Sequence, residues 1–176
     1  MAARLFAAAC ATYAGVLLAL AVTLPERVPL HFGADLQVDR TGDRAELLVA
    51  AALAGGLIAL LFGGLARWAH RLPLHAVNVP HPQYWKSPEH EGELRRRIRT
   101  DLLGMGAATL AFLAALFALV GAAAVAGTGL SGWAVVLLAG FFGGLLLWVV
   151  WLGTRRYRPP ASGSPTVTSG TADSPV

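Results

Sequence analysis

The residues best suited to chemistry lie together in one polar stretch that reads LPERVPLHFGADLQVDRTGDR. A histidine nitrogen and two carboxylates on a short loop, His31, Asp35 and Asp39, could bind a divalent cation. Their spacing matches no established metal loop. The competing interpretation is that Asp39 forms a surface ion pair with Arg40 or Arg44, while His31 hydrogen-bonds the returning backbone. We favour the second interpretation and expect neither a metal nor a cofactor.

The rest of the chain has the composition of a membrane protein. Apolar residues make up 56% of it and charged residues only 14%, with a mean hydropathy of +0.59. The charges collect in blocks between long apolar runs, whereas the helices of a soluble domain would each carry a polar stripe. The isoelectric point near 10 therefore reflects membrane topology and lipid contact. It does not indicate nucleic-acid binding, because the sequence contains no motif for it.

Four apolar segments are long enough to cross the roughly 30 Å hydrocarbon core as helices. They cover about residues 5–24, 47–66, 102–126 and 133–152. A glycine-rich turn at residues 127–132 divides the last two, which together contain no charged residue. We expect an all-α integral membrane protein, a four-transmembrane-helix bundle, with a disordered C-terminal tail. The membrane domain would end at residue 152 and the tail would comprise residues 153–176, which have few large apolar side chains.

The distribution of lysine and arginine predicts the orientation of this bundle. Eleven of the 14 lie on the side that holds both termini and the loop of residues 67–101, and three lie in the loop of residues 25–45. Both termini are therefore expected in the cytoplasm, and the loop of residues 25–45 outside. The first apolar segment could alternatively be a cleaved secretory signal, with Ala19-Leu20-Ala21 as the cleavage site. We favour a retained span, because the segment is longer than a usual signal core.

Local signals predict how the helices begin. Asp43 and Glu46 have the D-x-x-E spacing of a capping box at the start of the second span. Ser87 and Pro88 predict another helix start, with Ser as the N-cap and Pro in the first turn, and this helix should run directly into the third span. Two i to i+4 pairs would stabilise it: Glu91 with Arg95, and Glu93 with Arg97.

The start of this helix also carries a basic collar. Arg95, Arg96, Arg97 and Arg99 are expected at the membrane surface, in contact with anionic lipid headgroups. Simple anchoring of the topology and docking of an acidic protein are both compatible with this cluster. Four histidines in the same loop are irregularly spaced and lack cysteine partners. They are therefore expected to be solvated residues and not zinc ligands.

The four spans themselves contain no ionisable acid or base of the kind that transporters and membrane enzymes use. We therefore expect no enzyme activity. Polar and small residues in the spans are expected to serve packing, including the G-x-x-x-G spacing of Gly140 and Gly144. Packing inside one bundle is the favoured use of that motif, and a homo-oligomer is the alternative.

The two loops resemble those of a known membrane family. Directly after the first span come Leu24-Pro25, then Val28-Pro29-x-His31-Phe32, then Val38-Asp39-Arg40. The second loop contains Asn78-Val79-Pro80, then Tyr84-Trp85, then Pro88-Glu89. In this order the sequence resembles the family DUF1648 over about residues 3–112. Leu36 occupies the position where the family usually places a turn glycine, so the tight turn is expected to shift towards Gly33.

The resemblance implies a small bacterial inner-membrane (plasma-membrane) protein. Some relatives are immunity proteins that protect cells against a sporulation-delay toxin and relay its presence to a repressor. On this basis the outer loop is a candidate ligand-binding site, and the cytoplasmic loop a candidate site for a regulator. The outer candidates are Pro29, His31, Phe32, Asp39 and Arg40, and the cytoplasmic candidates are Pro80, Tyr84, Trp85, Pro88 and Glu89. A small permease or an accessory subunit of a transporter is the alternative function.

Overall fold

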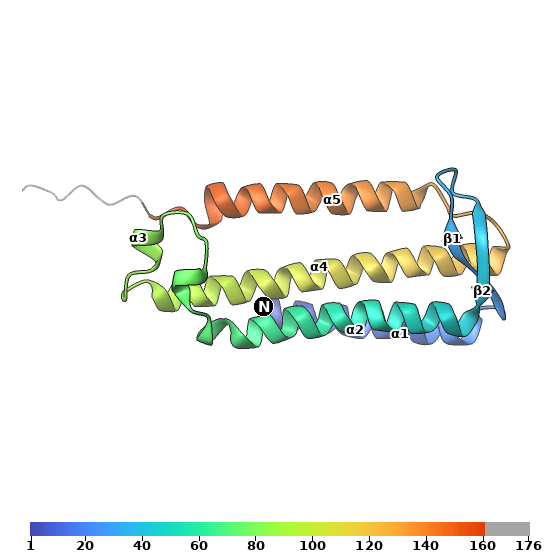
Figure 1. Ribbon diagram of the computed structural model, residues 1–176, viewed down its shortest axis with the longest axis horizontal. Coiled ribbons are helices and arrows are strands. Elements are labelled where there is room, and N and C mark those ends of the chain that lie inside the picture. The colour runs from blue at the N-terminus through green and yellow to red at the C-terminus, as the bar shows by residue number, and fades with distance from the viewer. Residues whose placement is uncertain (161–176) are drawn as a thin grey trace, which may run out of the picture.

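The computed structural model describes residues 1–160 and contains four helices long and apolar enough to cross a membrane (Figure 1). They are α1 (Ala2–Thr23), α2 (Arg44–Trp68), α4 (Glu91–Ala126) and α5 (Trp133–Trp151). The predicted architecture of four spanning helices is confirmed. The predicted tail from residue 161 onward lies outside the described residues.

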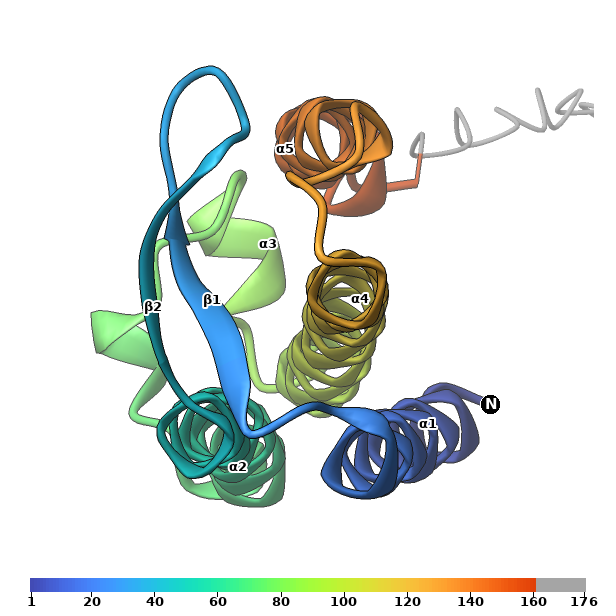
Figure 2. The same ribbon diagram turned by 90° about the vertical axis from the view of Figure 1, so that its right-hand side faces the viewer.

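Three of the helices form the packed centre of the bundle. Figure 2 shows α1, α2 and α4 as a triangle, with α5 beyond α4. The contacts agree with this view, because α4 packs against both α1 and α2, whereas α5 packs mainly along α4. Helix α4 therefore contacts every other long helix. At 36 residues it is also the longest of them, about 54 Å at 1.5 Å per residue.

A small residue on α2, Gly55, allows α1 and α2 to approach closely. The Tyr13 ring lies against Gly55 so closely that a Cβ atom there would overlap it. The Tyr13 hydroxyl also donates a hydrogen bond to the Ala51 carbonyl, at 2.5 Å. On α5 the situation is different, because a Cβ at Gly140 or Gly144 would meet no heavy atom within 4 Å in the described part of the chain. The expectation that this G-x-x-x-G pair packs inside the bundle was wrong.

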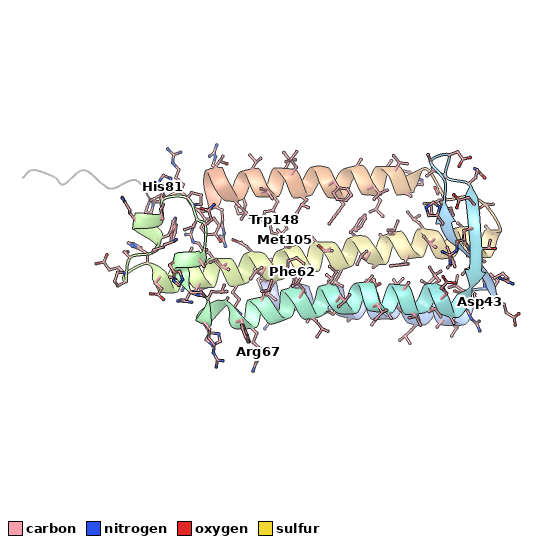
Figure 3. All side chains as sticks on the ribbon, in the orientation of Figure 1. Asp43, Phe62, Arg67, His81, Met105 and Trp148 are labelled. Atoms are coloured by element: carbon pink, nitrogen blue, oxygen red, sulfur yellow. The ribbon has the colours of Figure 1, made fainter. Side chains whose placement is uncertain are left out.

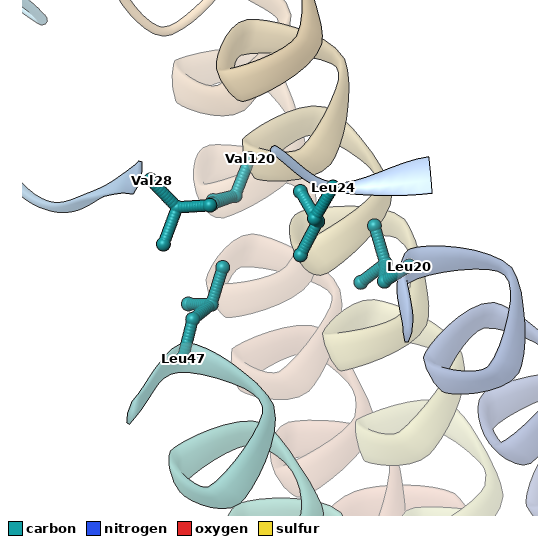
Figure 4. Packing of buried hydrophobic residues seen from close by; sticks show 5 residues of the cluster. All are labelled: Leu20, Leu24, Val28, Leu47 and Val120. Carbon is teal, nitrogen blue, oxygen red and sulfur yellow. The ribbon is translucent and has the colours of Figure 1, made fainter. Parts of the chain in front are cut away.

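One end of the bundle, the hairpin end, is covered by two antiparallel strands that the sequence analysis did not predict. Strand β1 (Arg27–Phe32) pairs with β2 (Val38–Asp43), with irregular register beyond Pro29. The fully buried Val28 attaches the hairpin to the bundle. It packs in what we call the hairpin-end cluster, together with Leu20, Leu24, Leu47 and Val120 (Figure 4).

The opposite end, the loop end, is built from short elements between α2 and α4. They are η1 (Ala69–Arg71), η2 (Leu74–Ala76) and α3 (Pro82–Trp85), while η3 (Leu152–Arg156) extends α5. Helix α4 begins at Glu91, with His90 as its N-cap, and not at Pro88 with Ser87 as its N-cap, because the Ser87 hydroxyl closes the preceding turn by donating to the Tyr84 carbonyl, at 2.9 Å. The predicted start was three residues too early. The helix does run without a break into the apolar segment, as expected.

Candidate functional site

The polar face of the hairpin is organised by two ion pairs across its strands and the start of α2. His31 Nδ1 lies 2.7 Å from Asp39 Oδ1, and Arg40 Nη2 lies 2.8 Å from Glu46 Oε1. The sequence analysis had paired Asp39 with an arginine and His31 with backbone, and both assignments were wrong. All four side chains are more than half exposed. They therefore form an accessible surface with alternating charge.

The capping box predicted at the start of α2 is not formed. Asp43 is the N-cap residue, but its side chain makes no capping hydrogen bond and lies 3.8 Å from Arg27 instead. Glu46 is engaged by Arg40. The neighbouring Arg44 donates to the Leu24 carbonyl at 3.2 Å, which joins the end of α1 to the start of α2. Ion pairs with Arg27 and Arg40 of the hairpin have thus replaced local capping.

The tip of the hairpin turns at Leu36, which adopts a left-handed conformation with φ of 64°. The prediction that the turn would shift onto Gly33 was wrong. For a residue with a Cβ atom this conformation costs roughly 1–2 kcal/mol. A hydrogen bond from the Leu130 amide to the Leu36 carbonyl, 2.8 Å long, holds it there. Gly129 makes this approach feasible, because a Cβ at that position would lie only 2.7 Å from the same carbonyl oxygen.

The predicted outer-loop residues separate into two groups. Pro29 is buried and Phe32 is half-buried against the hairpin-end cluster, so both serve packing. His31, Asp39 and Arg40 are exposed and could touch a ligand. Asp35 has a local task instead, because its carboxylate accepts a hydrogen bond from the Gln37 amide. Within residues 1–160, no group of three or more His, Cys, Asp and Glu side chains is arranged to hold a metal ion.

At the loop end, Trp85 is a core residue. It is 1% exposed and packs with Val79, Leu94 and Tyr157 in what we call the loop-end cluster. Its indole Nε1 donates to the Tyr157 carbonyl at 2.7 Å, and the Arg97 guanidinium lies 4.6 Å from its ring centre. Trp85 therefore cannot itself contact a partner in this conformation.

The other predicted cytoplasmic-loop residues surround this buried tryptophan. Pro80, Pro88 and Glu89 are exposed. Tyr84 is half-buried and stacks on His90, with the ring centres 3.8 Å apart. A partner protein could reach the three exposed residues and one edge of Tyr84. The tryptophan would support that surface from beneath.

Sequence reasoning missed the contribution of Tyr157, which it had assigned to the tail. The Tyr157 hydroxyl donates to the Asp101 carboxylate at 2.8 Å, and Arg156 forms an ion pair with the same carboxylate at 3.3 Å. Burial raises the pKa of the Tyr157 hydroxyl, and the hydrogen bond to Asp101 raises it further. The packed part of the chain thus extends to Tyr157, beyond the predicted boundary at residue 152. The sequence did offer two signals. Asp101 lies directly before the charge-free run of residues 102–154, and Tyr157 lies just after it.

The arginines of the predicted basic collar differ in what they contact. Arg95 donates to Glu91, to the Ala69 carbonyl at 3.2 Å and to the Leu72 carbonyl at 2.7 Å. Arg97 likewise donates to Glu93 and to a backbone carbonyl of η3. Both predicted i to i+4 ion pairs are therefore present.

These contacts fix Arg95 and Arg97 against protein acceptors, so they are unsuited to the lipid contact expected of them. Arg96 and Arg99 are exposed. Arg96 pairs with Glu93, whereas Arg99 has no hydrogen-bond or ion-pair partner among the described residues. Of the four predicted collar residues, Arg99 is the one best placed to meet a headgroup.

Comparison with known families gives a match for the N-terminal part of the chain. Residues 8–55 match the family model described as a domain of unknown function, DUF1648. Over these residues the chain is similar to DUF1648. Comparison with curated proteins and with solved structures found no match.

The segment that matches DUF1648 comprises most of α1, the hairpin and the first half of α2. Four of the five members of the hairpin-end cluster belong to it, all except Val120. Tyr13 and Gly55, which bring α1 and α2 together, lie near its two ends. The matched segment is thus a helix, hairpin and helix unit that uses α4 to complete its core. The second loop, where the sequence also resembled the family, lies beyond the matched residues.

Proposed function

We propose that this chain is a bacterial plasma-membrane protein that binds a ligand with its hairpin and relays that event to a cytoplasmic partner. In this proposal it performs no chemistry and needs no cofactor. The ligand surface consists of His31, Asp39 and Arg40, and the partner surface lies around Tyr84 and Glu89. A role like that of toxin-immunity proteins fits this arrangement.

One observation carries the proposal: α4 is a single continuous helix that forms part of the core at both ends of the molecule. At the hairpin end, Val120 packs against Val28 in the hairpin-end cluster. At the loop end, Leu94 is fully buried in the loop-end cluster. A displacement of the hairpin therefore has a direct mechanical route, through one helix, to the candidate partner surface.

Relay also requires that the ligand prefer one arrangement of the hairpin over another. The hairpin supplies two features that suit a movable element. Its ion pairs are exposed, so each contributes little stability, and its tip contains the unfavourable backbone conformation of Leu36. A ligand that bound the exposed charges could change how Val28 packs in the hairpin-end cluster at a low cost in free energy.

Hydrogen exchange of the full chain in lipid nanodiscs tests the coupling. Val28→Ala should loosen the hairpin and raise exchange severalfold both in residues 113–126 and in residues 91–100 of α4. Val149→Ala removes the same two methyl groups from an exposed position on α5, so it should leave both segments unchanged. Faster exchange confined to residues 113–126 would show that coupling stops within the helix, and the relay proposal would fail.

The orientation we propose places both termini and the loop end in the cytoplasm, as the arginine distribution favours. Gln37 and Gln83 are exposed at opposite ends of the bundle. Single cysteines at these positions, with Cys10 replaced by serine, can be labelled with a membrane-impermeant thiol reagent in intact cells. Labelling of Gln37→Cys alone is expected. Labelling of Gln83→Cys alone would reverse the orientation.

The permease alternative has a distinct prediction. It requires a polar path through the bundle, and the cavities between α4 and α5 are lined by apolar side chains apart from Thr109 and Trp148. A solute flux into proteoliposomes that His31→Ala abolishes would favour transport. Crosslinking from Glu89 to a transcription regulator, lost in an Asp39→Ala variant, would favour relay.

A further inference from the structure

A cavity of about 860 Å³ lies at the loop end, between the start of α1, the end of α2 and the first turns of α4. Its walls combine two kinds of surface. Phe6, Ala66 and Leu103 provide an apolar wall that continues into the packed helices. Five arginines line the rest. Arginines above an apolar wall form an amphipathic site, in contrast to the alternating charges of the hairpin.

The positive charge of this cavity is only partly offset. Glu91 and Glu93 neutralise two of the five arginines, Arg95 and Arg96. Arg67, Arg71 and Arg99 have no acidic side chain within 4 Å among residues 1–160, and all three are exposed. Figure 3 shows Arg67 extending away from the end of α2. Three unpaired guanidinium groups around one cavity favour an anion, and guanidinium matches the geometry of phosphate.

The position of Trp68 indicates that the cavity lies at the depth of lipid headgroups. Trp68 lines it and is 64% exposed at the last position of α2. Exposed tryptophans at the ends of membrane helices lie in the interface between headgroups and hydrocarbon. A ligand in this cavity would therefore have its anionic part among the arginines and its apolar part beside Phe6 and Leu103.

We propose that this cavity binds one anionic phospholipid, with its phosphate held by Arg67, Arg71 and Arg99 and its upper acyl chains against the apolar wall. The volume lies within the range of small-molecule sites and exceeds what a free phosphate needs. The continuous apolar wall favours a lipid over a soluble phosphate compound. The site depends neither on the proposed relay nor on the orientation of the bundle.

The site is also held in shape by contacts that use only one nitrogen, Arg71 Nε, of the three arginines. Arg95 ties η1 to α4 through the Ala69 carbonyl. His70 Nδ1 lies 2.8 Å from the Arg67 carbonyl, and its Nε2 accepts a hydrogen bond from Arg71 Nε at 3.1 Å. This arrangement fixes the turn after α2, where two of the three arginines are attached. The cavity is thus preorganised before a lipid enters it.

Native mass spectrometry of the full chain in detergent, titrated with phosphatidylglycerol or phosphatidylcholine, tests the proposal. The double variant Arg67→Gln with Arg99→Gln should weaken phosphatidylglycerol binding roughly 30-fold, from about 1 kcal/mol for each charge lost. Arg155→Gln with Arg158→Gln is the matched control. It removes two exposed charges at the same end but outside the cavity, and binding should change less than about threefold. Phosphatidylcholine should bind weakly to every form.

Three results would overturn the proposal. Equal losses in the two double variants would assign lipid retention to overall charge, and unchanged binding in the Arg67 and Arg99 variant would exclude the site. Displacement of phosphatidylglycerol by millimolar inorganic phosphate or glycerol 3-phosphate would assign the cavity to a soluble phosphate compound. The variant Arg67→Lys with Arg99→Lys, together with thermal unfolding of each protein, separates loss of charge from loss of fold. It should retain most of the binding.

Discussion

The Leu130 amide donates a 2.8 Å hydrogen bond to the Leu36 carbonyl, which joins the tip of the hairpin to the loop between α4 and α5. The donor lies beyond the residues that match DUF1648 and the acceptor lies among them. This bond stabilises a left-handed residue that would otherwise be unfavourable. It also makes the hairpin dependent on the second half of the chain.

Gly129→Ala should break this connection. The added Cβ would lie 2.7 Å from the Leu36 carbonyl oxygen, so the loop must move away and the hydrogen bond is lost. We expect a loss of about 1–3 kcal/mol in the free energy of unfolding, measured by denaturant titration in mild detergent. Gly132→Ala is the control, because a Cβ there meets nothing within 4 Å in the described residues. Equal stability of the two variants would contradict the role given to Gly129.

Gly55→Ala should separate α1 from α2. The new methyl group would overlap the Tyr13 ring and displace its hydroxyl from the Ala51 carbonyl. We expect a cost of about 1–3 kcal/mol, seen as a lower thermal unfolding midpoint. The adjacent Gly56 has open space at its Cβ position. Gly56→Ala should therefore be neutral or slightly stabilising, and a similar loss at both positions would argue against this contact.

Tyr157 should make part of the stability depend on alkaline pH. Its folded-state pKa is raised above the usual value of about 10, so the neutral hydroxyl is favoured by folding. This contribution is complete below pH 10 and is lost as the pH rises above it, because the unfolded chain then releases the proton more readily. Thermal unfolding between pH 8 and 11 should show a steeper fall for the natural chain than for Tyr157→Phe.

The same variant has a predictable effect at neutral pH. Tyr157→Phe removes the hydrogen bond to Asp101 but keeps the ring in the loop-end cluster, and Arg156 still pairs with the carboxylate. We expect a loss of about 0.5–1.5 kcal/mol at pH 7. An unchanged alkaline slope together with full stability at pH 7 would show that this hydrogen bond does not form.

His31→Ala should leave stability nearly unchanged. The pair with Asp39 is short but exposed, with side-chain exposures of 66% and 52%, so water competes for both groups. We expect a change below about 1 kcal/mol in a double-mutant cycle with Asp39→Ala. A coupling energy of several kcal/mol would identify the pair as structural, and would remove it as a candidate ligand surface.

The sequence predicted the spans well because crossing a bilayer constrains composition over about twenty residues at a time. It predicted the hairpin poorly. Strand pairing depends on which residues meet across the turn, and the pairing of Arg40 with Glu46 removed the acid on which the expected capping box relied. Leu36 shows the same limit, because a tertiary hydrogen bond allows a conformation that local preference disfavours.

The loop end shows why side-chain roles were harder to predict than helix positions. Trp85 was a candidate recognition residue because of the family resemblance, yet Tyr157, 72 residues away, helps to bury it. Arg95 and Arg97 looked like lipid-facing charges, but the backbone carbonyls that they contact become available only after the loop has folded. Such long-range acceptors leave no local pattern in a sequence.

The position of α5 at the edge of the triangle has a consequence for how its residues can change. Leu146 and Leu147 are 65% and 71% exposed, so substitution by another apolar residue there should leave the packing of the bundle unchanged. Phe141, in contrast, stacks on Phe112 of α4, with the ring centres 4.2 Å apart. One side of α5 should therefore drift freely through evolution, while the other keeps its aromatic identity.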